Sequence, residues 1–331
     1  MYSVTIPSDC IRTNYDSYYL VKYPKEKKHD PDYRLARSLI YRSDGTLVCF
    51  SPPKSDAFET FSELHPIQIT TCQEFIDGTM INAFYDNTWK ISTKSILGAK
   101  CTFESEHTFA HLFESCLSAS GITYDDLNTF YTYSFVMQHP ENKIVLDVKE
   151  PRLYLVGVYE IIGNVVGEHE IPFLKPPEYR FDSYNKAIKF VQTREMKGLM
   201  FKCNGFRAKI KNAQYIFLSE LKGNSPFSYH YLCIRNTPQK EEYMKHFQRD
   251  ITKGIEYESK IENLADQLFC DYKKCFIYKE QPLNTYPKKN YMYDLHGIFL
   301  NELKPKFMSK KRVLEYVNSL QPNRLFTLLQ M

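Results

Sequence analysis

The stretch CQEFIDGTMINAFYDNTWKISTKS, residues 72–95, decides the fold of this chain. It contains two β-rich runs, MINAFY and WKIST, separated by the turn residues Asp86-Asn87-Thr88, and this pattern is typical of a β-hairpin. Similar paired runs surround three other turns, at Asp44-Gly45, Gly163-Asn164 and Cys203-Asn204-Gly205. Four hairpins before about residue 215 predict a framework of antiparallel sheets.

Helical patterns occur between these strands and dominate the end of the chain. Apolar residues recur at helical spacing from Phe109 to Leu117, and a second helix is expected after Ser183. Later the strand pattern ends, and the spacing from Ile251 to Leu268 favours a long helix. A chain of 331 residues suits a larger domain plus a smaller one. We therefore predict an α+β domain over residues 1–237 and a C-terminal α-helical domain over 238–331.

Composition limits the setting of the protein more than its function. Lysine and arginine number 43 against 39 acidic residues, and a net charge of +4 is weak support for a polyanionic partner. No window reaches the length of a membrane span, and the first residues lack the pattern of a signal peptide. The nine cysteines are odd in number and lack zinc-ligand spacing. We expect reduced thiols, a cytoplasmic location and no membrane partner.

Short motifs carry the functional information, and they occur in a fixed order along the chain. In that order they are Arg37-Ser38-Leu39-Ile40-Tyr41, Asp44-Gly45, Lys54, Asp77-Gly78-Thr79, Thr93-Lys94-Ser95, Tyr133-Ser134-Phe135-Val136, Lys197-Gly198-Leu199-Met200 and Lys209-Ile210-Lys211. Each motif alone is weak, and Asp77-Gly78 by itself would read as an ordinary turn. Their order resembles that of the covalent nucleotidyltransferase superfamily, and within it the phage-type ATP-dependent RNA ligases.

A closer resemblance concerns proteins of large DNA viruses. The segments EFIDGTMIN (74–82), SFVMQHPENKIV (134–145) and LEYVNSLQPNRLF (314–326) are similar to RNA ligase-like open reading frames of these viruses. The resemblance implies a nucleotidyltransferase (RNA ligase) fold, in which antiparallel sheets flank a nucleotide-sized cleft. It also implies ATP as a cofactor and RNA or a nucleotide as a partner. A viral source would place the protein in the host cytoplasm or in the virion.

The chain departs from the family pattern at three positions that bear on catalysis. Family ligases attack the α-phosphate of ATP with a lysine amine, and counting back from Asp77-Gly78 places Phe75 at that position. Ser134 stands where the family has a glutamate, and Lys197 stands where the Glu-Gly motif has its acid. Asp77 and Gly78 of the motif are retained. Because Phe75 stands at the position of the nucleophile, no catalytic residue is assigned. Because Ser134 and Lys197 replace acids, a bound Mg²⁺ is doubtful.

The residues that remain are mainly those that handle anions. The resemblance assigns nucleotide or phosphate binding to Arg37, Lys54, Lys94, Lys209 and Lys211, and the exchange at Lys197 adds one more cation. Such a site would hold phosphates without a metal ion, because lysines supply the positive charge. The leading hypothesis is an RNA ligase-like protein that lacks the adenylylated lysine and binds nucleotide or RNA phosphate ends.

Other interpretations stay open from the sequence alone. An active ATP-dependent RNA ligase would need a relocated lysine, and Lys54, Lys94, Lys197 and Lys209 are the candidates. A structural subunit of a viral assembly would instead bind a protein partner through the helical domain. In the plainest interpretation Phe75 packs within a strand, and the paired lysines of the last motif lie on a solvated face.

Overall fold

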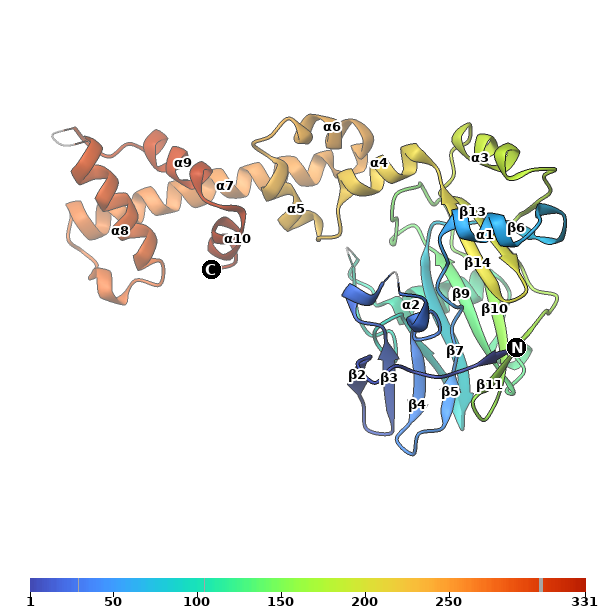
Figure 1. Ribbon diagram of the computed structural model, residues 1–331. Helices are drawn as coiled ribbons and strands as arrows, with labels where there is room; N and C mark the ends of the chain where they lie inside the picture. The colour runs from blue at the N-terminus through green and yellow to red at the C-terminus, as the bar shows by residue number, and fades with distance from the viewer. Residues whose placement is uncertain (29, 104, 304–305) are drawn as a thin grey trace. The chain divides into compact units, whose positions relative to one another are not determined.

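The computed structural model describes residues 1–28, 30–103, 105–303 and 306–331. The chain forms two compact units, Met1–Glu220 and Leu221–Met331 (Figure 1). The boundary that we predict after residue 237 therefore differs from this division. The last strand ends at Lys211, and the aromatic run Phe227–Ile234 forms a helix although its composition suits a strand.

The largest sheet of the first unit has six strands, all paired antiparallel. Their order is β1 (Tyr2–Ser3), β11 (Val165–His169), β10 (Arg152–Ile162), β9 (Tyr131–Gln138), β7 (Thr79–Asp86) and β8 (Thr88–Ser92). Helix α2 (Phe109–Ala119) packs on one face through buried Leu112, Phe113 and Leu117, as its spacing predicts. The opposite side of β7 and β9 is left to line the cavity described below.

Two four-stranded sheets complete the first unit. One has the order β12 (Glu178–Tyr179), β6 (Thr71–Glu74), β13 (Gly198–Cys203) and β14 (Phe206–Lys211), and the other the order β2 (Ile11–Asn14), β3 (Tyr18–Lys22), β4 (Leu39–Arg42) and β5 (Leu47–Cys49). Helices α1 (Phe58–Leu64) and α3 (Tyr184–Gln192) share a core with β13 and β14. Ser183 caps α3 by accepting a hydrogen bond from the backbone of Lys186, so the predicted helix start is confirmed.

All four predicted hairpins are present, as β4–β5, β7–β8, β10–β11 and β13–β14. Their turns contain residues with positive φ, namely Gly45, Asn87, Gly163, Asn204 and Gly205. Glycine and asparagine tolerate this conformation better than other residues do. The predicted antiparallel framework is therefore confirmed, and each hairpin sets the register of its strands.

The second unit is helical, as predicted. Its helices are α5 (Phe227–Ile234), α6 (Gln239–His246), α7 (Ile251–Tyr272), α8 (Lys289–Ile298), α9 (Lys310–Ser319) and α10 (Pro322–Gln330), and α4 (Ala213–Lys222) ends at the boundary. Leu264, Leu268, Leu295, Val313 and Leu325 form the centre of its core. Within the described residues, no helix has the length and apolar character that crossing a membrane requires.

Candidate functional site

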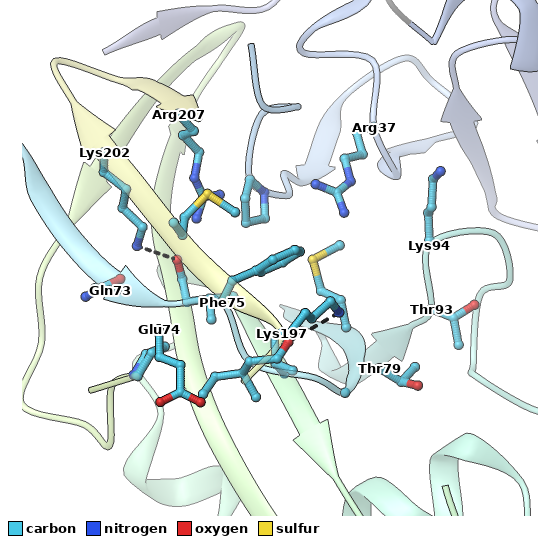
Figure 2. A pocket seen from close by; sticks show the side chains of 18 of the residues that line it. Arg37, Gln73, Glu74, Phe75, Thr79, Thr93, Lys94, Lys197, Lys202 and Arg207 are labelled. Atoms are coloured by element: carbon cyan, nitrogen blue, oxygen red, sulfur yellow. Dashed lines mark hydrogen bonds between the residues drawn. The ribbon is translucent and has the colours of Figure 1, made fainter. Parts of the chain in front are cut away.

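A cavity of about 340 Å³ lies within the first unit, beside the strands β6, β7, β13 and β14. Its apolar wall includes Phe75, Ile76, Met80, Val136 and Met200. Five cationic side chains line it as well, and these are Arg37, Lys94, Lys197, Lys202 and Arg207. Figure 2 shows the ring of Phe75 among these cationic groups. The cavity thus combines an apolar surface with strong positive charge.

Phe75 lies in this cavity immediately after β6. Its backbone N–H donates to the carbonyl of Gly198 at 2.9 Å, which fixes the residue against the start of β13. The Nζ atoms of Lys197 and Lys209 lie 4.4 and 5.4 Å from the centroid of its ring. Cations at these distances are attracted to an aromatic face. The residue predicted to replace the nucleophile therefore contacts two of the predicted phosphate-binding lysines.

Asp77 is buried, and both of its carboxylate oxygens have partners. Oδ2 accepts hydrogen bonds from the backbone N–H groups of Val145 and Leu146, each at 3.0 Å. Oδ1 accepts from the hydroxyl of Tyr215 at 2.6 Å and lies 3.4 Å from Nζ of Lys197. With these four contacts the carboxylate anchors the loop after β9 to the start of β7.

Lys197 is held by that carboxylate at the edge of the cavity. Its side chain is 14% exposed, and Nζ also donates to the carbonyl of Ile76 at 3.4 Å. Burial lowers the pKa of Lys197, and the neighbouring Asp77 charge offsets part of this effect. Position 197 therefore contributes a lysine that forms an internal ion pair with a buried carboxylate.

Gly78 meets a steric requirement of the site. A Cβ atom at this position would lie 2.4 Å from the carbonyl oxygen of Met137 and 2.8 Å from a methyl carbon of Val136. We expect Gly78→Ala to destabilise the protein by about 2–3 kcal/mol in urea unfolding, because backbone must move. In the control Gly167→Ala, the new Cβ would meet two ring atoms of His169, at 3.4 and 3.9 Å. Equal stability of the two variants would contradict this account.

Ser134 does not line the cavity; it is fully buried behind it. Its hydroxyl donates to Oδ1 of Asn82 at 2.8 Å, and Nδ2 of Asn82 donates to the hydroxyl of Ser38 at 3.3 Å. Ser38 in turn donates to the carbonyl of Thr93 at 3.1 Å. Neutral groups therefore satisfy one another's hydrogen-bonding capacity here, and they connect β9, β7 and the segment that precedes β4.

The predicted phosphate-binding residues divide into two groups. Arg37, Lys94 and Lys197 line the cavity, whereas Lys54, Lys209 and Lys211 do not. Lys209 and Lys211 are exposed on one face of β14, as the plain interpretation of this pair expects. The Nζ atom of Lys209 nevertheless lies near Phe75. Although the residue as a whole is exposed, partial burial of this amine, followed by the charges of Arg37 and Lys211, lowers the pKa of Lys209 to about 8.

Tyr23 links two of these cations, although the sequence did not single it out. Lys94 donates to its hydroxyl at 3.0 Å, and Nζ of Lys54 lies 5.5 Å from its ring centroid. Burial raises the pKa of Tyr23, but the hydrogen bond from Lys94 and the charges of Lys94, Arg37 and Lys54 outweigh it. The pKa of Tyr23 is therefore lowered, which reflects a local excess of positive charge.

Sequence reasoning also missed Lys202 and Arg207, which line the cavity from β13 and β14. Burial, followed by the charge of Arg207, lowers the pKa of Lys202 to about 7. Arg207 was detectable, because residues 207, 209 and 211 alternate along one strand and share a face. Lys202 becomes a neighbour of Arg207 only through the register of β13 and β14.

The carboxylates at the cavity do not fit a Mg²⁺ ion held by the protein alone. Of the described residues that line it, Glu74 is the one acid, and burial raises its pKa. Tyr179 donates to that carboxylate at 3.2 Å, and the oxygens of Asp77 are already engaged. Across the part of the chain that the structure describes, no three His, Cys, Asp or Glu residues are grouped for a metal. Magnesium is usually held by one or two carboxylates together with substrate phosphates and water, and of the described lining residues Glu74 alone offers a carboxylate.

Comparisons with known proteins place the chain near viral and ligase proteins without identifying its site. No protein-family profile matches the chain. It is 26% identical over 180 residues to the RNA ligase of Rhodothermus phage RM378, covering 43% of this chain and 41% of that protein. It is also 26% identical over 216 residues to the immediate-early protein ICP-46 homolog of Invertebrate iridescent virus 3, covering 60% of this chain and 48% of that protein. The chain thus spans less than half the length of these curated relatives.

The chain also has a weak overall similarity to solved ligase structures. An archaeal ATP-dependent RNA ligase is 12% identical with a TM-score of 0.45, covering 76% of each chain. A mutant Naegleria gruberi RNA ligase with ATP and Mn is 10% identical with a TM-score of 0.37, covering 51% of this chain and 58% of that one. The phage relative confirms the resemblance to RNA ligases, and the structure confirms antiparallel sheets with C-terminal helices. The chain is therefore similar to an RNA ligase over part of its length, and both of these curated relatives come from viruses.

Proposed function

We propose that the protein binds the phosphates of a nucleotide or an RNA end in this cavity, without covalent attachment and without a protein-held metal ion. The observation that carries the proposal is the lining of the cavity, where five cationic side chains face one carboxylate among the described residues. A cavity of about 340 Å³ lies within the usual size range of ligand pockets. Its apolar wall suits a base, and its cations suit phosphate oxygens.

Within the described structure, most cations of the cavity have no carboxylate beside them to balance their charge. Among the described residues, Arg37, Lys94, Lys202 and Arg207 form no ion pair with a carboxylate, and Lys197 alone is paired. Burial depresses the pKa of Arg37, Lys197 and Lys202, which means that the fold disfavours their charged forms. A bound polyanion would compensate these charges, because phosphate oxygens carry the negative charge that the described lining lacks.

The groups at the nucleophile position favour binding over covalent chemistry. The ring of Phe75 has no atom that forms a phosphoramidate, and the amine of Lys197 is engaged by Asp77. One observation favours the alternative of a relocated nucleophile. The pKa of Lys209 is lowered to about 8, so part of this amine is neutral near physiological pH, and it lies close to Phe75.

Calorimetric titration with ATP in the presence of EDTA tests the proposal. We expect saturable binding that EDTA leaves unchanged, and an affinity at least about tenfold lower in Arg37→Gln, because one charge-assisted contact is lost. Lys186→Gln is the control, since this exposed lysine of α3 pairs with Asp182 away from the cavity. Binding that disappears with EDTA would contradict a metal-independent site. No binding of ATP or RNA under any condition would favour the structural-subunit interpretation.

Intact-mass measurement after incubation with ATP and Mg²⁺ or Mn²⁺ separates binding from covalent chemistry. We expect no AMP-sized adduct on the protein. An adduct would establish the alternative of an active ligase, and peptide mapping would then identify the lysine. Lys209→Gln would be the matched variant, because Lys209 is the candidate that both the sequence and its lowered pKa indicate.

A further inference from the structure

Lys202 and Arg207 face each other directly across the β13–β14 hairpin. Residues directly opposite in an antiparallel pair have closely spaced Cβ atoms, and like charges at such positions are destabilising. On the same face of the hairpin, Lys209 lies opposite the uncharged Met200 and Lys211 lies opposite Gly198. The pairing of two cations is therefore particular to this position.

Both cations are shielded from solvent, and neither forms an ion pair with a carboxylate in the described structure. Arg207 is 7% exposed, and within the described chain its Nε atom has no hydrogen-bond partner. Lys202 donates from Nζ to the carbonyl of Val156 at 3.2 Å (Figure 2). A buried polar group without a partner is costly, and a buried charge is more so. This arrangement points to a ligand that supplies the missing negative charge.

The pair also lies where two cavities meet. It lines the cavity described above and an adjoining cavity of about 240 Å³, and Gln73 and Val156 are shared as well. The acids of the second cavity already have partners. Glu168 accepts a hydrogen bond from the hydroxyl of Tyr2 at 3.0 Å, and Glu170 pairs with Lys175 at 3.0 Å. Neither carboxylate forms an ion pair with Lys202 or Arg207 in the described structure.

We propose that Lys202 and Arg207 form a binding site for one phosphate group at the junction of the two cavities. A planar guanidinium beside an ammonium group offers several donors to tetrahedral oxygens, which matches phosphate better than a single cation does. The inference rests on the proposed function, because a ligand of the first cavity would deliver this group. Its phosphate belongs either to the terminus of an RNA strand or to the phosphate chain of a nucleotide.

Titration with inorganic phosphate in the presence of EDTA tests the site itself. We expect one binding event, weakened at least about tenfold in Lys202→Gln and in Arg207→Gln and unchanged in Lys186→Gln, the exposed control. Lys202→Arg keeps the positive charge and should retain most of the affinity, which separates loss of charge from loss of fold. Equal binding by all variants would overturn the proposal. Binding that both glutamine variants retain would also overturn it, because the phosphate would then be an adventitious ion only.

The source of the phosphate is distinguished by pairs of ligands that differ in that group alone. A 5′-phosphorylated oligoribonucleotide is compared with its 5′-hydroxyl form, and ATP is compared with adenosine. If Arg207→Gln removes only the preference for the 5′-phosphate, the group belongs to RNA; if it removes only the preference for ATP, the group belongs to the nucleotide. Retained preference for both would overturn the subsite while leaving the proposed function intact. Phosphate binding without ATP or RNA binding would overturn the proposed function and support the subsite.

The pH dependence gives a readout that a purely structural role would not change. The charged groups that face Lys202 are Arg207, Lys175, Glu168 and Glu170. Sulfate serves as the probe, because its charge is constant over the range used. We expect its affinity to fall at least about tenfold between pH 6 and pH 9 as Lys202 loses its proton, and to fall much less in Lys202→Gln. The same decline in both proteins would contradict a role for Lys202 in anion binding.

Discussion

Replacing Asp77 with alanine is expected to lower the free energy of unfolding of the first unit by about 3–5 kcal/mol. The substitution removes the acceptor of two backbone N–H groups and of the Tyr215 hydroxyl, and leaves Lys197 as a buried, unpaired cation. Urea unfolding followed by fluorescence measures the effect. Trp89 is the only tryptophan and lies in β8, so it reports on the first unit.

A matched control separates this effect from that of removing any acid. Asp182→Ala also removes a carboxylate paired with a lysine, but both partners are exposed, and we expect a change below about 0.5 kcal/mol. The double variant Asp77→Asn with Lys197→Met should lose less stability than the sum of its single variants, because it removes both charges. Additive losses would show that the Asp77–Lys197 contact contributes little.

The second large expected effect is a dependence of stability on pH that is traceable to Lys202. Its pKa in the folded protein is about 7, below its ordinary value of 10.5. Between these values the unfolded chain binds more protons than the folded one, so stability rises with pH in this window. Lys202 should contribute an increase of about 1–2 kcal/mol between pH 7 and pH 9, after allowance for its partial exposure.

The comparison with Lys202→Met isolates this contribution. The variant should be more stable than the parent at pH 6, and the difference should shrink as the pH rises to 9. Buried thiols act in the opposite direction, since burial raises the pKa of Cys49, Cys72 and Cys116, and they affect both proteins equally. Saturating sulfate should reduce the dependence of stability on pH in the parent protein and leave that of Lys202→Met unchanged. Parallel pH profiles would refute the assignment to Lys202.

The elements of the fold were predictable because local signals agree with tertiary structure. The turns at Asp44-Gly45 and Asn204-Gly205 and the cap at Ser183 lie where the sequence predicts them. The domain boundary was not predictable in this way. The run Phe227–Ile234 has the composition of a strand, but it packs as a helix against other helices of the second unit.

The candidate site was predictable only in part, for a geometric reason. The order of motifs indicates Phe75, Arg37 and Lys94, and these do line one cavity. Lys209 and Lys211 lie outside its lining, because the spacing of residues along a strand fixes a face and not a depth. Lys54 also lies outside it, in the segment between β5 and α1. The meeting of Lys202 and Arg207 depends on the register of β13 and β14, and the burial of Ser134 depends on its contact with Asn82.

The ion pair between Lys197 and Asp77 limits which side chains position 197 can hold. A carboxylate there would bring a second negative charge beside the buried Asp77, and the two would repel each other. An acid introduced at this position would therefore destabilise the fold unless a cation bound with it. The interior of the first unit thus constrains the charge of its cavity, because a lysine at this position satisfies a buried acid as well as facing the ligand space.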